Sequence, residues 1–156
     1  MQRISPHISY QEAVKSATAI RHGIDNKPSD LQLIDMRRLA LDVFEPLRAR
    51  FNRPIGISSF FRSAELNKKI GGSSRSQHCC PDGQAAMDID ADVFGGIENR
   101  EIFEFIRDEL PFDQLIWEFG DGSNPDWVHV SLKSTNNRKQ ILKAVKHGSK
   151  TLYLRY

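Results

Sequence analysis

The segment Gln114–Leu132 reads QLIWEFGDGSNPDWVHVSL and decides the fold class of the chain. Its two ends, 114–119 and 127–132, are rich in aromatic and β-branched residues, which favour strands. Between them lies GDGSNP, in which Gly, Asp, Asn and Pro are typical of turns. The segment therefore predicts two neighbouring antiparallel strands joined by a turn.

Further elements are predicted on both sides of this pair. Short strands are expected at Pro54–Ser59, Met87–Asp90 and Thr151–Arg155, and helices at Ser63–Ile70, Asn99–Leu110 and Arg138–His147. The last helix is basic and is followed by Gly148, a residue that often ends helices. The region 73–82 is a polar loop.

Two amphipathic helices are predicted in the first third of the chain, within residues 9–50. Ser9 and Glu12 have the spacing of a capping box, and this helix should end near Gly23. Asp30 can cap a second helix, in which apolar residues recur every three or four positions as far as Leu47. Residues 1–8 are expected to be a flexible tail. Because helices and short strands are mixed without regular alternation, we predict an α+β fold with a small, mostly antiparallel sheet and flanking helices.

The composition is that of an ordinary globular protein. Its 156 residues fit one domain, and 39% of them are hydrophobic and 27% charged. No apolar run approaches the ~18 residues of a membrane span, and the first residues lack the apolar core of a secretory signal. Two adjacent cysteines, Cys79 and Cys80, provide no disulfide framework. We expect a monomer that is synthesised in the cytoplasm without a signal peptide.

Charge is unevenly distributed, although the net charge is only +2. Residues 88–126 include twelve acidic and two basic side chains, and the residues after Leu132 include seven basic and no acidic ones. An acidic middle attracts cations, and a basic tail attracts anionic polymers. Because the tail carries no known nucleic-acid motif, we interpret it as a solvated face and expect no specific nucleic-acid partner.

Two of the five histidines stand out by their surroundings. His78 follows a serine-rich loop and precedes the carboxylate-bearing strand Met87–Asp90, and His129 lies in the middle of a later strand. Two histidines and one carboxylate from separate elements form a set that commonly holds zinc and leaves a fourth position for water. Zinc lowers the pKa of its bound water from ~15.7 towards ~7. A hydrolase also needs a carboxylate near that water, and Asp126, three residues before His129, is a candidate.

Four motifs, in order along the chain, resemble the M15 family of zinc peptidases. They are SSFFRSAELNKKIGGSSRSQH (58–78), GQAAMDID (83–90), QLIWEF (114–119) and DWVHVS (126–131). The stretches ATAIRHGIDNKPSD (17–30) and FEPLRARF (44–51) are similar to small single-domain members from bacteriophages and prophages. The resemblance implies the Hedgehog/DD-peptidase fold, a Zn²⁺ cofactor and a peptidoglycan peptide as substrate. It also implies one peptidase domain over residues 1–156, with a metal-site core at 54–132 and a basic C-terminal segment at 133–156.

The resemblance also assigns roles to individual residues. The family motif SxHxxGxAxD places two zinc ligands at His78 and Asp88, and the final WxH strand places the third at His129. Asp126 is implied to be the catalytic base. Arg62, in the S-x-x-R-S segment, is implied to bind a substrate carboxylate or carbonyl, or the developing oxyanion. The residues implied to line the substrate groove are Ser76, Gln114 and Glu118.

The chain departs from the motif in one spacing. Nine residues separate His78 from Asp88, three more than in the motif, and the additional residues lie within CCPDGQAAM. Asp90, on the same strand face, is therefore an alternative ligand, and Asp82 is a third candidate. Glu118 is an alternative base. Thiolates bind zinc well, but we interpret the two cysteines as loop residues, because a bound thiolate would occupy the position of the water.

The resemblance implies an enzyme that hydrolyses peptidoglycan stem peptides. The same metal set serves a carboxypeptidase acting on D-Ala-D-Ala and an endopeptidase acting on L-Ala-D-Glu. A phage-like N-terminal region favours phage lysis or cell-wall penetration, in the cell wall or periplasm after release or from a phage particle. The alternative is an inactive relative that serves as a phage structural or cell-wall-binding module. That alternative predicts a missing ligand or base, whereas candidates for all of them are present.

Overall fold

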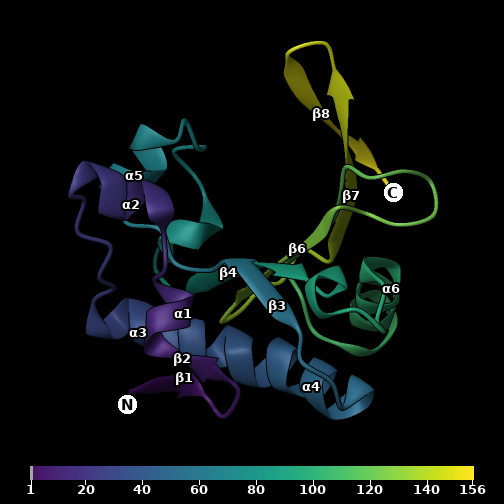
Figure 1. Ribbon diagram of the computed structural model, residues 1–156, viewed down its shortest axis with the longest axis horizontal. Coiled ribbons are helices and arrows are strands. Elements are labelled where there is room, and N and C mark those ends of the chain that lie inside the picture. Colours follow the sequence, from purple (N-terminus) through teal and green to yellow (C-terminus); the bar gives the residue numbers. More distant parts are fainter. Residues whose placement is uncertain (1) are drawn as a thin grey trace.

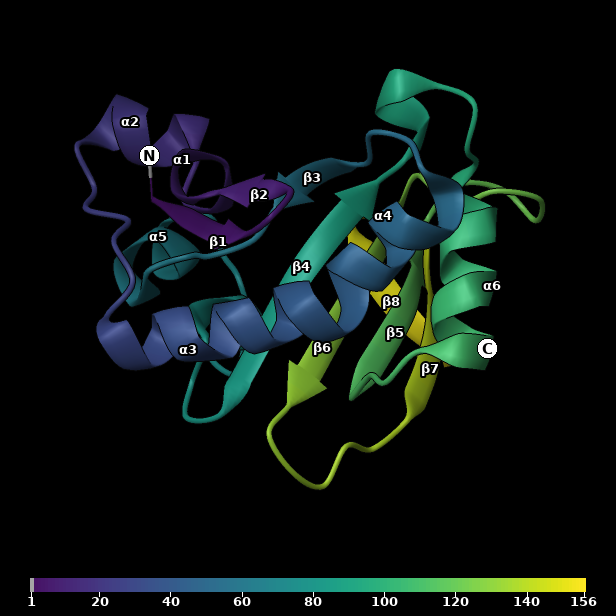
Figure 2. The same ribbon diagram turned by 90° about the horizontal axis from the view of Figure 1, so that it is seen from below.

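In the computed structural model, which describes residues 2–156, a six-stranded sheet carries helices on one of its faces (Figures 1 and 2). The strand order is β3-β4-β6-β5-β7-β8, and every pair is antiparallel except β5 and β7. The strands are β3 (Gly56–Ser59), β4 (Gln84–Asp90), β5 (Gln114–Glu118), β6 (Trp127–Lys133), β7 (Gln140–His147) and β8 (Lys150–Arg155). The predicted α+β class with a mostly antiparallel sheet is confirmed.

The quoted segment 114–132 forms the centre of this sheet. β5 and β6 pair antiparallel, with Ile116 opposite His129, and β4 lies on the other side of β6 with Asp88 opposite His129. Directly paired residues share a face of a sheet, and the residues two positions away share it too. Asp88 and His129 therefore project from the same face, beside each other.

The opposite face of the sheet carries the hydrophobic core. Alternate residues of the central strands, among them Met87, Ile89, Trp117, Val128 and Val130, are all buried there. This face is covered by α3 (Asp30–Leu39), the π-helical turn η1 (Ala40–Phe44), α4 (Glu45–Phe51) and α6 (Asn99–Glu109). Figure 2 shows α3, η1 and α4 as one rod that crosses the sheet. The core thus holds the sheet flat against the helices and leaves the other face for polar side chains.

The start of the chain differs from the sequence-based expectation. Residues 3–9 form a small hairpin of β1 (Arg3–Ser5) and β2 (Ile8–Ser9), and not a flexible tail, because Ile4 and Ile8 are buried in the core. Met1 lies outside the described residues. The first expected helix is divided into α1 (Tyr10–Ala13) and α2 (Ala17–His22), because the Ser16 hydroxyl accepts a hydrogen bond from the backbone N–H of Ala19 and starts a new helix.

The second helix and the central elements lie close to their predicted places. Ser29, one residue before the expected cap, starts α3 in a capping box with Gln32. Ser63 caps α5 (Ala64–Lys69), and short 3₁₀ turns occur at η2 (Gln77–Cys79) and η3 (Asp92–Phe94). No helix in the described part of the chain has the length and apolar character of a membrane span.

The prediction of a basic helix at Arg138–His147 is wrong, because this segment forms β7. It pairs with β5 on one side and with β8 on the other, and Gly148 turns the β7–β8 hairpin with a φ of 61°. The buried carboxylate of Asp113 accepts hydrogen bonds from the backbone N–H and the guanidinium of Arg138. This contact fixes the entry to β7 beside the start of β5. The apolar spacing of Ile141 and Ala144 suits a helix as well, so only the pairing with β5 decides the outcome.

Candidate metal centre

The backbone around His78 fixes the direction of its imidazole. Ser76 caps the η2 turn, and its hydroxyl accepts a hydrogen bond from the backbone N–H of His78 at 3.3 Å. The ring atom Nδ1 lies 2.7 Å from the carbonyl oxygen of Phe60. A carbonyl only accepts, so Nδ1 carries the proton and donates it, and the lone pair of Nε2 faces the sheet. This tautomer is the one that a metal-binding histidine needs.

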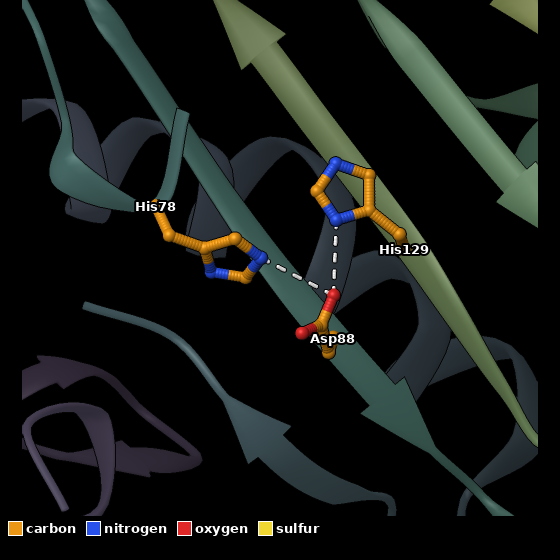
Figure 3. A group of neighbouring side chains, drawn as sticks. All are labelled: His78, Asp88 and His129. Carbon is orange, nitrogen blue, oxygen red and sulfur yellow. Dashed lines mark hydrogen bonds and ion pairs between the residues drawn. The ribbon is translucent and has the colours of Figure 1, made fainter. Parts of the chain in front are cut away.

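Asp88 and His129 complete a compact group on the polar face of the sheet (Figure 3). His129 Nδ1 lies 2.9 Å from Asp88 Oδ1, and His78 Nε2 lies 3.3 Å from the same oxygen. The three ligand atoms all lie within 4.8 Å of one another. Figure 3 shows both rings turned towards the carboxylate, His78 from its loop and His129 from β6.

Burial and the neighbouring imidazoles together set the pKa of the Asp88 carboxylate. Burial alone would raise the pKa of Asp88, but the two imidazoles beside it, those of His78 and His129, outweigh burial and lower the pKa. The pKa therefore stays well below its usual range, and Asp88 is ionised at neutral pH. The two histidines are themselves buried, with 3% and 9% of their surfaces exposed. An ionised carboxylate between two buried imidazoles is a donor set that suits a cation.

The spacing of the donor atoms fits zinc. Ligand atoms about 2.1 Å from a tetrahedral zinc ion lie about 3.4 Å from one another. The two histidine nitrogens lie 2.9 and 3.3 Å from Asp88 Oδ1, close to that value, and all three atoms lie within 4.8 Å of one another. Two nitrogens and one oxygen are typical zinc donors, and three protein ligands leave the fourth position open. The group therefore has the composition of a catalytic site and not of a closed structural one.

Arg62 contacts two residues of the metal group, His78 and Asp88. Its backbone N–H donates to the carbonyl oxygen of His78 at 3.0 Å, and its Nη2 lies 3.5 Å from Asp88 Oδ2. Its Nε donates to the hydroxyl of Ser59. The guanidinium thus lies beside the second oxygen of Asp88 and remains partly exposed.

Asp126, the residue implied to be the base, lies immediately before β6. Its backbone N–H donates to the carbonyl oxygen of Glu118 at 2.9 Å, and its side chain is exposed. It lines a pocket of about 620 Å³. The fully buried Asn99 holds this corner, because its amide donates to the carbonyl oxygen of Asp126 and to Asp90 Oδ1.

Glu118, the alternative base, lies on the same face as His129 but within the sheet. Glu118 pairs with Trp127, two residues along each strand from the pair of Ile116 and His129. Only 7% of its surface is exposed. Burial raises the pKa of Glu118 to about 7, and the charge of Asp88 adds to this, whereas His129 and Lys146 oppose it. The structure thus offers two candidate carboxylates: an exposed one just before β6 and a buried one on the face that carries His129.

The other residues singled out in the sequence lie around this group. Asp90 projects towards Asn99, and Asp82 is exposed in the loop before β4, so neither is part of the donor group. The amide of Gln114 bonds to Gln140 on β7. Burial raises the pKa of the Cys80 thiol to about 12, which makes it a poor metal ligand.

A protein-family model described as Peptidase M15 matches residues 6–131, most of the chain. The chain belongs to the peptidase M15 family. Membership implies a peptidase, and the His–Asp–His group of this M15 chain is suited to a metal ion. No protein with a curated description matches it. The match ends at Ser131, within β6, so it leaves out β7 and β8.

Two residues of the site were not predicted from the sequence. The contribution of Phe60 is a backbone carbonyl, which no side-chain pattern reveals. Asn99 was seen only as the start of a helix, although it is fully buried and ties Asp90 to the loop that carries Asp126. The available signal for Asn99 was its place directly before the apolar face of a helix, close in sequence to several acidic residues.

The choice between Asp88 and Asp90 gives a first prediction. Asp88→Ala is expected to lose zinc, because one of three donors is removed, whereas Asp90→Ala is expected to keep it. Elemental analysis after dialysis measures both, and circular dichroism checks that each variant is folded. Zinc retained in Asp88→Ala and lost from Asp90→Ala would show that Asp90 is the ligand.

Proposed function

We propose that this M15 chain is a zinc-dependent peptidase that hydrolyses peptide bonds of peptidoglycan stem peptides, as a carboxypeptidase or an endopeptidase. The observation that carries the proposal is the convergence of His78, Asp88 and His129 on one buried point in a chain of this family. An inactive relative would be expected to lose a donor, and this group is complete. The phage-like N-terminal motifs support a place in phage lysis or cell-wall penetration.

The proposed mechanism uses the charged groups around the centre. When zinc is bound, it supplies a Lewis acid and an acidified water molecule. Asp126 takes the proton of the attacking water and returns it to the leaving amine. Arg62, fixed by Ser59 and His78, offers a cationic donor to the substrate carbonyl or to the oxyanion that develops from it. Ser76 holds His78 in position through the turn.

Digestion of purified peptidoglycan with the zinc-loaded protein tests the proposal. We expect soluble fragments whose masses identify the bond: loss of one alanine for a carboxypeptidase, or separation of L-Ala from D-Glu for an endopeptidase. Asp88→Ala serves as the inactive control, and Asp82→Ala, an exposed aspartate in the loop before β4, as the matched active one. A zinc-loaded protein that releases no fragment from any peptidoglycan type would contradict the proposal and favour the binding module.

A further inference from the structure

The C-terminal hairpin continues the face of the sheet that carries the metal centre. Glu118 stands opposite Ala144 of β7, and Ala144 stands opposite Tyr153 of β8. Because paired residues share a face, Tyr153 projects on the same side as Glu118 and His129. The family match ends at residue 131, so this part of the face is an addition to the matched region. Figure 1 shows the hairpin extending beyond the helices at one end of the molecule.

Lys146 presents a cation on this extension. It lies two positions after Ala144, so it shares the face, and its ammonium lies 4.6 Å from the centre of the Phe119 ring. The same nitrogen is 3.4 Å from the hydroxyl of Thr151. Within residues 2–156, no carboxylate lies at ion-pair distance from it, and the side chain is exposed. Phe119 also borders the pocket that Asp126 lines, so Lys146 stands beside that pocket.

Tyr153 adds a neutral donor beside this cation. Half of its surface is exposed, so its ring forms part of an open wall. Burial raises the pKa of the phenol, and the charges of Glu118 and Asp88 raise it further. The hydroxyl therefore keeps its proton at neutral pH. The register, in which Ala144 stands between Glu118 and Tyr153, places the tyrosine on the side of the hairpin nearer to the metal centre.

We propose that Lys146 and Tyr153 form a subsite for a carboxylate of the peptide substrate. The proposal rests on the proposed function and names the class of substrate: a stem peptide with a free carboxylate away from the scissile bond. An ammonium and a phenol on one open wall both donate, and their natural partner is an anion. Aromatic support of the ammonium by Phe119 holds it in place without neutralising it.

The strand order defines where this carboxylate lies along the peptide. Arg62 follows β3 at one edge, and the hairpin is at the other edge, with the metal centre on β4 and β6 between them. Strands are about 4.8 Å apart, so β8 lies about 14 Å from β6. Side chains of about 6 Å reach back over part of that distance. The carboxylate is therefore about two to three residues from the scissile bond, because an extended peptide advances about 3.4 Å per residue.

A comparison of matched peptides tests the subsite. The probes are a stem pentapeptide and versions in which its carboxylates are converted one at a time to carboxamides. The protein variants are Lys146→Met and Tyr153→Phe, with Lys143→Met as a control, since Lys143 lies on the same strand but faces the opposite side. Calorimetry with hydrolysis-resistant, N-methylated peptides measures binding to the zinc-loaded proteins. Hydrolysis of the normal peptides gives kcat/KM.

We expect one carboxamide to weaken binding to the wild type about tenfold, which corresponds to about 1.4 kcal/mol. Lys146→Met should weaken binding of the unmodified peptide by a similar factor. The variant should bind the peptide with that carboxamide as tightly as the wild type does, because the interaction is already lost. Tyr153→Phe should show the same pattern with a smaller factor, and Lys143→Met should match the wild type. Equal effects of Lys146→Met on all peptides, or no effect on any, would overturn the subsite. Absence of hydrolysis by the wild type would instead contradict the proposed function, whatever the binding data show.

Discussion

Replacing His129 by alanine is expected to remove zinc from the protein and to reduce peptidoglycan hydrolysis to background. His129 is one of only three donors in the group, and its Nδ1 lies 2.9 Å from Asp88 Oδ1. With two donors left, the affinity for the metal falls steeply. Loss of the metal removes both the Lewis acid and the acidified water that hydrolysis needs. Elemental analysis for zinc and digestion of peptidoglycan, measured on the same preparation, check the two effects together.

A matched control separates metal loss from damage to the fold. His22→Ala removes an exposed histidine from the end of α2 and should keep both zinc and activity. Because His129 is buried, His129→Asn is a second test that preserves more of the side-chain volume. Circular dichroism and thermal unfolding verify that the variants are folded. Full zinc content in a folded His129→Ala variant would show that this histidine is not a ligand.

The central hairpin was predictable because its signals are local. The segment 114–132 combines strand-forming residues with a dense turn, and both strands formed where the pattern indicated. The segment 138–147 was not predictable in the same way. Its apolar spacing is compatible with a helix and with a strand. The pairing of β7 with β5 decides the outcome, and the contact of the buried Asp113 with Arg138, 25 residues apart, fixes the entry to β7. Such a long-range contact leaves no periodic trace in the sequence.

The arrangement of the metal group also depends on long-range contacts that the sequence does not reveal. The sequence supplied the residue types, and the resemblance supplied the order, but the pairing of β4 with β6 brings Asp88 opposite His129. The longer spacing after His78 left Asp90 as an alternative. In the structure the segment 79–87 comprises the end of η2, a turn and the first half of β4, and a turn can take up added residues without moving the elements that it joins. The orientation of His78 depends on a carbonyl of Phe60, which only the folded chain reveals.

The identity of the base gives the second large effect. If Asp126 transfers the proton, Asp126→Asn should keep zinc and fold but lower turnover by ~10²- to 10⁴-fold. That range corresponds to roughly 3–5 kcal/mol of transition-state stabilisation at about 1.36 kcal/mol per decade. Asparagine preserves the shape of the side chain and suits the turn before β6, so loss of basicity is the only intended change. Rates on peptidoglycan at saturating substrate, with zinc content measured in parallel, give the comparison.

Glu118→Gln is the decisive companion to this variant, because the two carboxylates occupy different environments. Asp126 is exposed in the pocket that it lines, whereas Glu118 is buried and its raised pKa of about 7 leaves it partly protonated at neutral pH. A partly protonated carboxyl is a weaker base and a better hydrogen-bond donor. We therefore expect Glu118→Gln, which retains a donor, to lower turnover far less than Asp126→Asn. The reverse order, with near-normal turnover of Asp126→Asn, would reject Asp126 and assign the proton transfer to Glu118.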